Sequence, residues 1–594
     1  MSDEHRSGMG AVPHDGGTGF RVWAPHADSV GVEGSFNGWD AASNPMEAED
    51  DAYWYADIAG AEHGDEYRFV IRNGEQELHR IDPYARQVTN SVGNAVIHDH
   101  RLFDWRGDDF RLPGFHQLVL YEAHVGTLFD STGDEPGTFA LAAAKLDHLA
   151  HLGITAIQLM PVAEFAGSHS WGYNPAHIFA VESTYGGPDA LKSFVLEAHQ
   201  RGIGVLIDVV YNHFGPSDLS LWQFDGWNEF DRGGIYFFND ERATTPWGDT
   251  RPDYGRGEVR RFLRDNALMW LRDYHADGLR FDMTPYIRTV DGAGTELPEG
   301  WSLLRWINKS VHEQFPGHIT IAEDMQGNPG ITTFDDFGAG FDSQWDGRFV
   351  HPVREAIEAY RDEDRSMEEV ADAVSVIYNG DPFHRVIYTE SHDEVANGKS
   401  RVVSEINPHD EHSWWSQKRS TLGAALVLTS PGIPMLFQGQ EFLEGGWFRD
   451  DVPLDWHLDR RFHGIVHLYR DLVELRLDAD GTSAGLQGAG LQILHRNDEA
   501  KVMAFHRWGD GGPGDDVVVV VNLSDTAFPE YRVGLPSPGL WRLRFNSDAA
   551  VYSDDFGDFD SFDVEAFPEG YDGCPASGTF GIAPYTALIY SREN

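Results

Sequence analysis

The sequence predicts an α/β protein in which a (β/α)8 TIM barrel is flanked by an N-terminal immunoglobulin-like β-sandwich and a C-terminal all-β sandwich. Three observations predict this fold. The chain has 594 residues, a length that suits roughly three domains. Short alternating strands fill both ends of the chain, and apolar strands alternate with amphipathic helices between them. We expect the three domains to cover residues 1–108, 109–474 and 475–594.

The N-terminal domain is predicted from short alternations of apolar and polar residues that are separated by turns. Its expected strands are residues 20–25, 29–34, 53–58 and 67–72. Between them, the segment Phe36-Asn-Gly-Trp-Asp40 carries an Asn-Gly turn dipeptide beside two aromatic residues. Such a segment suits either a hairpin corner or stacking on a sugar ring, and we favour the structural use.

The barrel is predicted from the pattern that begins at about Leu118. Eight apolar strands are expected, at residues 119–122, 156–160, 205–208, 278–282, 319–323, 340–342, 386–389 and 434–437. One of the connecting helices is expected at residues 258–276, where apolar residues recur at helical spacing. Eight such units close into a barrel. The second sandwich follows, with strands expected at residues 502–505, 517–521, 541–545 and 588–590.

The charge of the chain excludes two classes of partner. The formal net charge is −51 at pH 7, which repels nucleic acid and anionic membranes, so neither is expected as a partner. An uncharged substrate is compatible with this net charge. Only six of the 45 basic residues are lysines. This composition is typical either of adaptation to high salt or of a genome that prefers arginine codons.

The start of the chain lacks an apolar leader, and no later run of about 20 apolar residues could span a bilayer. We therefore expect an unexported, cytoplasmic protein. The single cysteine, Cys574, excludes an internal disulfide and a cysteine-based zinc cluster. No cofactor is expected, and no compact run of oxygen ligands predicts a metal such as calcium.

Carboxylates stand at the ends of four predicted barrel strands, where the loops form the mouth of a barrel site. They are Asp208, Asp282, Glu323 and Asp393. The two-residue period of a strand places Arg280 and Asp282 on the same inner face. A fixed positive charge beside Asp282 is expected to lower its pKa and keep it ionised, as a nucleophile requires.

Glu323 is expected to carry the proton that the departing glycosidic oxygen needs, because the anionic Asp282 nearby raises its pKa. Two carboxyl groups with such different pKa values, about 5 to 5.5 Å apart, carry out retaining glycoside chemistry. In that chemistry a covalent glycosyl-enzyme forms, and a second acceptor then attacks it.

Four segments resemble, in order and spacing, the four short conserved regions of the α-amylase family (glycoside hydrolase family 13). They are Asp208-Val-Val-Tyr-Asn-His213, Gly278-Leu-Arg-Phe-Asp282, Ala322-Glu-Asp324 and Ser391-His-Asp393. The resemblance implies that Asp282 is the nucleophile, Glu323 the acid/base and Asp393 the third carboxylate, which distorts the bound sugar. It also implies an α-glucan substrate such as glycogen, amylose or a malto-oligosaccharide. The substrate-binding residues that it implies are Tyr173, Asp208, His213, Arg280 and His392.

Some of these residues also have a plain structural interpretation. Asp208 is interpreted mainly as the anchor of Arg280, and Asn212 as a turn cap. His213 and His392 are assigned to the site because both lie next to carboxylate segments. For some tryptophans, stacking on glucosyl rings competes with core packing. These are Trp171, Trp247, Trp414, Trp415 and Trp447.

Within the α-amylase family, local features favour the glycogen and starch branching enzymes. Residues 20–25 and 36–40 resemble the glycogen-type carbohydrate-binding module that precedes their barrel. Residues 322–324 and 390–395 resemble their third and fourth conserved regions. The resemblance implies a glycosyltransferase of glycogen biosynthesis that cuts an α-1,4 bond and passes the severed chain to a glucan 6-hydroxyl.

Two other hypotheses remain open. Residues 185–216 and 266–275 resemble malto-oligosyltrehalose trehalohydrolases, although these usually carry Asn in place of Ser391. Met283-Thr-Pro285 departs from the usual branching-enzyme continuation, which leaves transfer and hydrolysis both open. A non-catalytic glucan-binding protein is the third hypothesis, and the intact set of Asp282, Glu323 and Asp393 argues against it.

Overall fold

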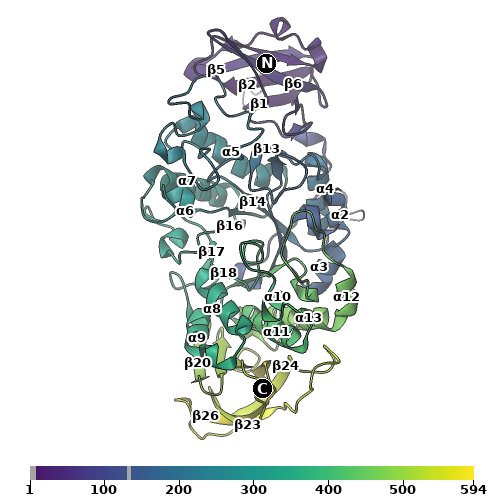
Figure 1. The fold of residues 1–594 in the computed structure, drawn as a ribbon, viewed down its shortest axis with the longest axis vertical. Coiled ribbons are helices and arrows are strands. Elements are labelled where there is room, and N and C mark those ends of the chain that lie inside the picture. The colour runs from purple at the N-terminus through teal and green to yellow at the C-terminus, as the bar shows by residue number, and fades with distance from the viewer. Residues whose placement is uncertain (1–7, 130–134, 594) are drawn as a thin grey trace.

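The computed structural model describes residues 8–129 and 135–593 and shows three parts along one long axis (Figure 1). An N-terminal β-domain lies at one end, the barrel in the middle and a C-terminal β-domain at the other end. In the part of the chain that is described, no helix combines the length and the apolar character needed to cross a membrane.

Eight parallel strands close into a barrel in the order in which they occur along the chain. They are β10 (Leu120–Ala123), β11 (Ala156–Leu159), β14 (Gly204–Val209), β15 (Gly278–Phe281), β16 (Ile319–Ala322), β17 (Ser343–Trp345), β18 (Arg385–Ile387) and β19 (Ile433–Phe437). Because β19 pairs with β10, the sheet has no free edge. The predicted barrel is confirmed.

Helices surround this barrel on its outside (Figure 1). The longer ones are α3 (Leu146–Leu152), α4 (Gly187–His199), α5 (Gly257–Asp273), α7 (Pro298–Gln314), α8 (Gly347–Glu358), α9 (Met367–Ser375), α11 (Trp414–Thr429) and α13 (His463–Arg476). Shorter helical turns are α1 (Val125–Leu128), α2 (Phe139–Ala143), α6 (Pro285–Arg288), α10 (Val402–Ile406) and α12 (His457–Arg461). Helix α5 ends earlier than predicted because His275 adopts a left-handed φ of 52°, which a helix cannot continue.

Two other features of the barrel differ from the prediction. The sixth strand is β17 at Ser343–Trp345, whereas the sequence indicates residues 340–342. Gly340 has a φ of 75°, so the backbone turns there before the strand begins. Between β16 and β17, the only helical element is a 3-10 turn at Pro329–Thr332, in place of the predicted helix.

Barrel side chains alternate between two layers, as the two-residue period of a strand requires. One set packs together inside the barrel: Leu120, Ala156, Leu206, Ile319, Ile321, Trp345, Val386 and Met435. The alternate set packs against the helices: Tyr121, Ile157, Ile207, Leu279, Phe281, Ala322, Ile387 and Leu436. Polar residues at the strand ends that continue the first set therefore also point into the barrel, and they form the site at its mouth.

The N-terminal domain has two sheets, ordered β1-β2-β5-β4 and β3-β6-β9-β8, with β7 added beside β6. The strands are β1 (Gly10–His14), β2 (Gly17–Trp23), β3 (Ser29–Gly34), β4 (Glu47–Ala48), β5 (Tyr53–Ala59), β6 (Glu66–Asn73), β7 (Gln76–Arg80), β8 (Gln87–Val88) and β9 (Ala95–Val96). The Asn-Gly segment is a 3-10 turn in which Asn37 donates to the carbonyl of Val32 at 2.9 Å. Asn37 also accepts from the Gly34 N–H at 2.9 Å, so this residue holds the corner together.

The C-terminal domain combines a six-stranded sheet, ordered β20-β21-β22-β27-β24-β25, with the pair β23-β26. Its strands are β20 (Gly490–Asn497), β21 (Val502–Trp508), β22 (Val517–Asn522), β23 (Phe528–Leu535), β24 (Gly539–Asn546), β25 (Val564–Ala566), β26 (Ala576–Ile582) and β27 (Thr586–Arg592). All four predicted strands fall within this set. The domain boundaries at residues 108 and 474 stay a prediction.

Candidate active site

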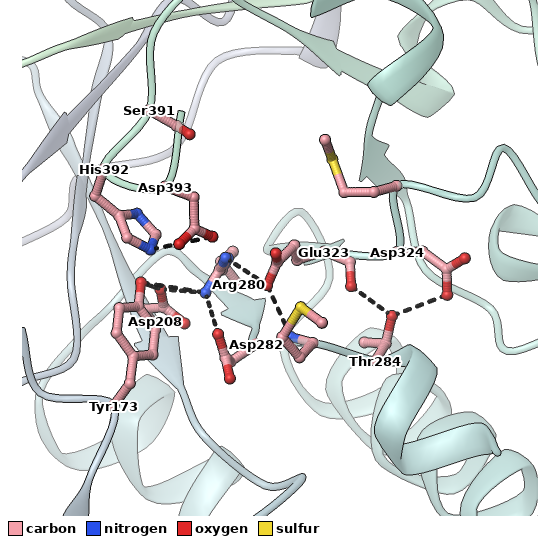
Figure 2. A network of polar contacts seen from close by, with 12 residues as sticks. Tyr173, Asp208, Arg280, Asp282, Thr284, Glu323, Asp324, Ser391, His392 and Asp393 are labelled. Atoms are coloured by element: carbon pink, nitrogen blue, oxygen red, sulfur yellow. Dashed lines mark hydrogen bonds and ion pairs between the residues drawn. The ribbon is translucent and has the colours of Figure 1, made fainter. Parts of the chain in front are cut away.

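The site residues predicted from the sequence lie together at the carboxyl ends of the barrel strands (Figure 2). Asp208 and Arg280 belong to β14 and β15, whereas Asp282 and Glu323 directly follow β15 and β16. His392 and Asp393 come from the loop after β18. This mouth is where the connecting loops of a barrel form its site.

Arg280 is the centre of the network. Its side chain is fully buried, and its Nη1 lies 2.6 Å from Asp208 Oδ2 and 3.1 Å from Asp282 Oδ1. Its Nη2 lies 2.8 Å from Glu323 Oε2. On one side the guanidinium lies 4.4 Å from the ring centroid of Trp345, which closes the barrel interior beneath it. Arg280 therefore fixes the positions of both carboxyl groups at once, with Asp208 as its anchor.

Asp282 accepts hydrogen bonds at both of its oxygens. Besides the contact with Arg280, the amide Nδ2 of Asn212 donates to Asp282 Oδ2 at 2.7 Å. Burial raises the pKa of Asp282 to about 6, although Arg280 acts to lower it. The expectation that Arg280 holds this pKa below its ordinary value is therefore wrong, because loss of hydration outweighs the ion pair. A pKa of about 6 still leaves the carboxylate ionised at neutral pH.

Glu323 has the opposite protonation state at neutral pH. Burial, together with the nearby charges of Asp282 and Asp393, raises its pKa to about 8, although Arg280 acts to lower it. Both donors to this group, Arg280 Nη2 and the Met283 N–H, contact Oε2 at 2.8 Å. Because Oε2 is occupied as an acceptor, the proton is expected on Oε1.

Met283 presents its N–H to Glu323 through an unusual backbone conformation. Its φ is 38°, in a region that residues other than glycine rarely adopt. Next to it, Thr284 donates to the Glu323 carbonyl at 2.8 Å and to Asp324 Oδ2 at 3.1 Å. Figure 2 shows this chain of contacts behind the acid/base candidate. The residues that follow the nucleophile candidate thus hold Glu323 and its neighbour in place.

His392 is held as a cation beside Asp393. Its Nδ1 lies 2.7 Å from Glu122 Oε1, and its backbone N–H donates to Glu122 Oε2 at 2.9 Å. Its Nε2 lies 3.5 Å from Asp393 Oδ2. Burial disfavours the charged ring, but the two carboxylates outweigh burial and raise the pKa of His392 to about 9. Asp393 has the most open side chain of the three carboxylates, which suits direct contact with a sugar.

Tyr173 and His213 contribute in different ways. The hydroxyl of Tyr173 donates to Asp208 Oδ2 at 2.7 Å, and its ring stacks on His392 with centroids 4.9 Å apart. The ring of His213 stacks on Trp247 and contacts the side-chain oxygen of Asn212. Burial lowers the pKa of His213 to about 4, so the ring is neutral. His213 therefore supports Asn212, which in turn holds Asp282.

Two polar residues of the site are missing from the sequence prediction. Asn212 is interpreted there as a turn cap, but it is fully buried and donates to Asp282. Glu122 ends the first predicted strand, and in the structure it is buried beneath His392. The sequence does contain a signal for Glu122, because this residue is a carboxylate at the end of a predicted barrel strand, as Asp208 and Asp282 are.

Replacing Asn212 with alanine is expected to lower kcat about 10- to 100-fold, because a hydrogen bond to a charged group is lost. That bond favours the ionised form of Asp282, so its loss should also raise the pKa of Asp282. The acidic limb of the kcat/KM profile should then move to higher pH. A kcat loss with an unmoved acidic limb would contradict the assigned contact. Asn308→Ala is the control, because Asn308 on α7 is similarly buried but donates to the Ala339 carbonyl.

Three family models match separate parts of the chain. Residues 8–85 match Carbohydrate-binding module 48 (Isoamylase N-terminal domain), and residues 127–223 match the Alpha amylase, catalytic domain. Residues 493–593 match the Alpha amylase, C-terminal all-beta domain. The matches follow the order of the three parts seen in the structure.

Similar proteins cover nearly the whole chain. The 1,4-alpha-glucan branching enzyme GlgB of Myxococcus xanthus is 34% identical, over 99% of this chain and 83% of that protein. The protein of the same name from Corynebacterium jeikeium is 32% identical over the same shares. Among solved structures, the pullulanase type I of Bacillus subtilis complexed with maltose superposes with a TM-score of 0.76 at 21% identity. That match covers 99% of this chain and 86% of the pullulanase, and it shows a shared fold.

Proposed function

Since the chain belongs to the 1,4-alpha-glucan branching enzyme family, within the wider α-amylase family, we propose that it cuts an α-1,4 bond of a glucan and transfers the released chain to a 6-hydroxyl. Its substrates are α-glucans such as glycogen, amylose and longer malto-oligosaccharides. The observation that carries the proposal is the pair of carboxyl groups on Arg280, one ionised and one protonated at neutral pH.

The first half of the reaction breaks the donor bond. The Asp282 carboxylate attacks the anomeric carbon, and a new carbon–oxygen bond forms as the bond to the glycosidic oxygen breaks. The proton on Glu323 passes to that departing oxygen, which leaves as a glucan 4-hydroxyl. Arg280 keeps its charge throughout and holds both carboxyl groups in place.

The second half reverses these roles. Glu323, now ionised, accepts the proton of a glucan 6-hydroxyl, whose oxygen attacks the anomeric carbon and releases Asp282. Asp393, the most open carboxylate, is placed to bind the hydroxyls of the reacting sugar, with the His392 cation beside it. The ring of Tyr173, stacked on His392, offers an aromatic face on which that sugar can rest.

The pH profile of kcat/KM is expected to be bell-shaped. Asp282 must be ionised, so activity should fall as the pH drops through its pKa of about 6. Glu323 must be protonated, so activity should fall as the pH rises through its pKa of about 8. Initial rates on amylose between pH 4 and 10 at constant ionic strength measure both limbs. A profile that stays flat through this range would contradict the assigned roles.

Incubation with amylose tests the proposed transfer. Branching shortens the linear chains, so iodine staining should fall while α-1,6 linkages appear and few new reducing ends form. Proton NMR of the product counts the α-1,6 linkages, and a reducing-sugar assay counts the new ends. Abundant reducing ends without α-1,6 linkages would instead identify a hydrolase, and an inert wild-type protein would identify a binding protein.

A further inference from the structure

A large groove lies outside the active site, at the junction of the barrel with the C-terminal domain. Its cavity volume is about 1060 Å³, and its walls come from the end of α8, the segment after α10, the start of α11 and the C-terminal domain. Figure 1 places α8, α10 and α11 beside the C-terminal domain. None of the residues assigned to the active site lines it. We call it the junction groove.

Two aromatic side chains of this groove face solvent. Tyr360, just after α8, is 89% exposed, and Trp415, in the first turn of α11, is 53% exposed. The neighbouring Trp414 differs from Trp415, because its ring packs against Tyr585 with centroids 5.8 Å apart. The ring of Trp415 stands at 87° to that of Trp414 and projects into the groove. Packing therefore accounts for Trp414 but not for the exposed ring of Trp415.

One guanidinium of the groove wall is almost completely buried. Arg419 lines the groove and is only 4% exposed. Its Nη1 donates to the Ala359 carbonyl at 2.7 Å, but its Nε has no partner among the described residues. That nitrogen is closed off from solvent, so Arg419 contributes a fixed positive charge to the groove wall and not a free N–H.

The charge of the groove restricts the ligand. Its lining holds five carboxyl side chains and two guanidinium groups, so an anionic ligand is repelled. The carboxyl groups are Glu358, Asp362, Glu363, Glu405 and Asp525. A second copy of this chain would bring its own net charge of −51 against this acidic lining. A neutral ligand rich in hydroxyls fits best, because carboxylates accept hydrogen bonds from hydroxyls while exposed aromatic faces pack on sugar rings.

We propose that the junction groove is a second α-glucan-binding site, in which Trp415 and Tyr360 support glucosyl rings and the carboxylates of the lining accept hydrogen bonds from sugar hydroxyls. This proposal rests on the proposed action on α-glucans. The site would hold a polymeric substrate or acceptor on the enzyme while another part of the same polymer reacts at Asp282. Two sites on one polymer raise the local concentration of chain at the active site.

Affinity electrophoresis in gels that contain glycogen tests this site. Trp415→Ala and Tyr360→Ala are each expected to weaken apparent glycogen binding about three- to tenfold, the range for losing one aromatic contact. Trp415→Phe should recover most of the affinity. Phe337→Ala is the matched control, since Phe337 is 87% exposed but lies outside the groove. Thermal unfolding midpoints check that each variant folds like the wild type.

The outcomes separate this site from the catalytic proposal. Turnover of a short malto-oligosyl fluoride should stay near the wild-type value in the Trp415→Ala/Tyr360→Ala double variant, because that donor needs only the active site. Unchanged glycogen affinity in this variant would overturn the junction groove as a glucan site while leaving the branching function intact. The groove would also be overturned if sedimentation showed that the wild type is a dimer that the double variant dissociates. A wild-type protein that neither binds nor modifies any α-glucan would instead overturn the proposed function itself.

Discussion

Asp282→Asn is expected to abolish glycosyl transfer, with a loss in kcat on the order of 10⁵- to 10⁶-fold, as when other enzymes lose their nucleophile. The amide cannot form the covalent glycosyl-enzyme on which both halves of the reaction depend. Its size and shape match the carboxylate, and the substitution removes a buried charge that burial disfavours. The loss of iodine staining and the appearance of α-1,6 linkages on amylose measure the effect.

Glucan binding should survive in Asp282→Asn, because the other contacts of the site remain. Asp342→Asn is the matched control: Asp342 is similarly buried but accepts from the Thr320 N–H at the start of β16, at the opposite end of the barrel. That control should keep its activity if it folds, which a thermal melt verifies. Retention of most of the activity in Asp282→Asn would refute its role as nucleophile.

Glu323→Gln is expected to slow the reaction on amylose about 10²- to 10⁴-fold, the usual contribution of a positioned acid or base. Glutamine keeps the hydrogen bonds from Arg280 and Met283 but cannot transfer a proton. A malto-oligosyl fluoride needs no proton to depart, so the glycosyl-enzyme should still form from it. Release of fluoride in the first turnover should therefore fall much less than transfer from amylose.

Glu394→Gln serves as the control for this comparison. Glu394 is two residues beyond His392 and pairs with His351 at 3.1 Å, outside the Arg280 network. Glu394→Gln should lower the rates with amylose and with malto-oligosyl fluoride only slightly and to the same extent. If Glu323→Gln slowed first-turnover fluoride release as much as transfer from amylose, Glu323 would not be the acid. Accumulation of glycosyl-enzyme in mass spectra of Glu323→Gln would further support its later role as base.

The barrel could be predicted strand by strand because most of its strands are short apolar runs, buried on both faces, that alternate with amphipathic helices. Strands β14 and β16 were located within one residue for this reason. The prediction for the sixth strand is wrong, because a strand of three residues, Ser343–Trp345, is too short to form a recognisable apolar run. The connection between β16 and β17 contains a 3-10 turn, Pro329–Thr332, where the repeating strand–helix pattern predicts a helix.

The sequence predicts which residues lie together at the barrel mouth, but only part of their electrostatics. The inward face shared by Arg280 and Asp282 follows from strand geometry alone, and the structure places the two side chains 3.1 Å apart. The direction of the pKa shift of Asp282 does not follow in this way. It depends on how deeply the group is buried, which is a property of the closed mouth and not of a neighbouring residue.

The residue types and their periods were enough to specify the barrel, the strand ends that carry carboxylates and the pairing of Arg280 with Asp282, because these depend on short stretches of chain. Contacts between distant segments required the folded chain. Glu122 and His392 are 270 positions apart, and they meet because β10 and the loop after β18 reach the same end of a closed barrel. Asn212 and Asp282, 70 positions apart, meet for the same reason. Burial and long-range hydrogen bonds set protonation, and both arise only when the barrel closes.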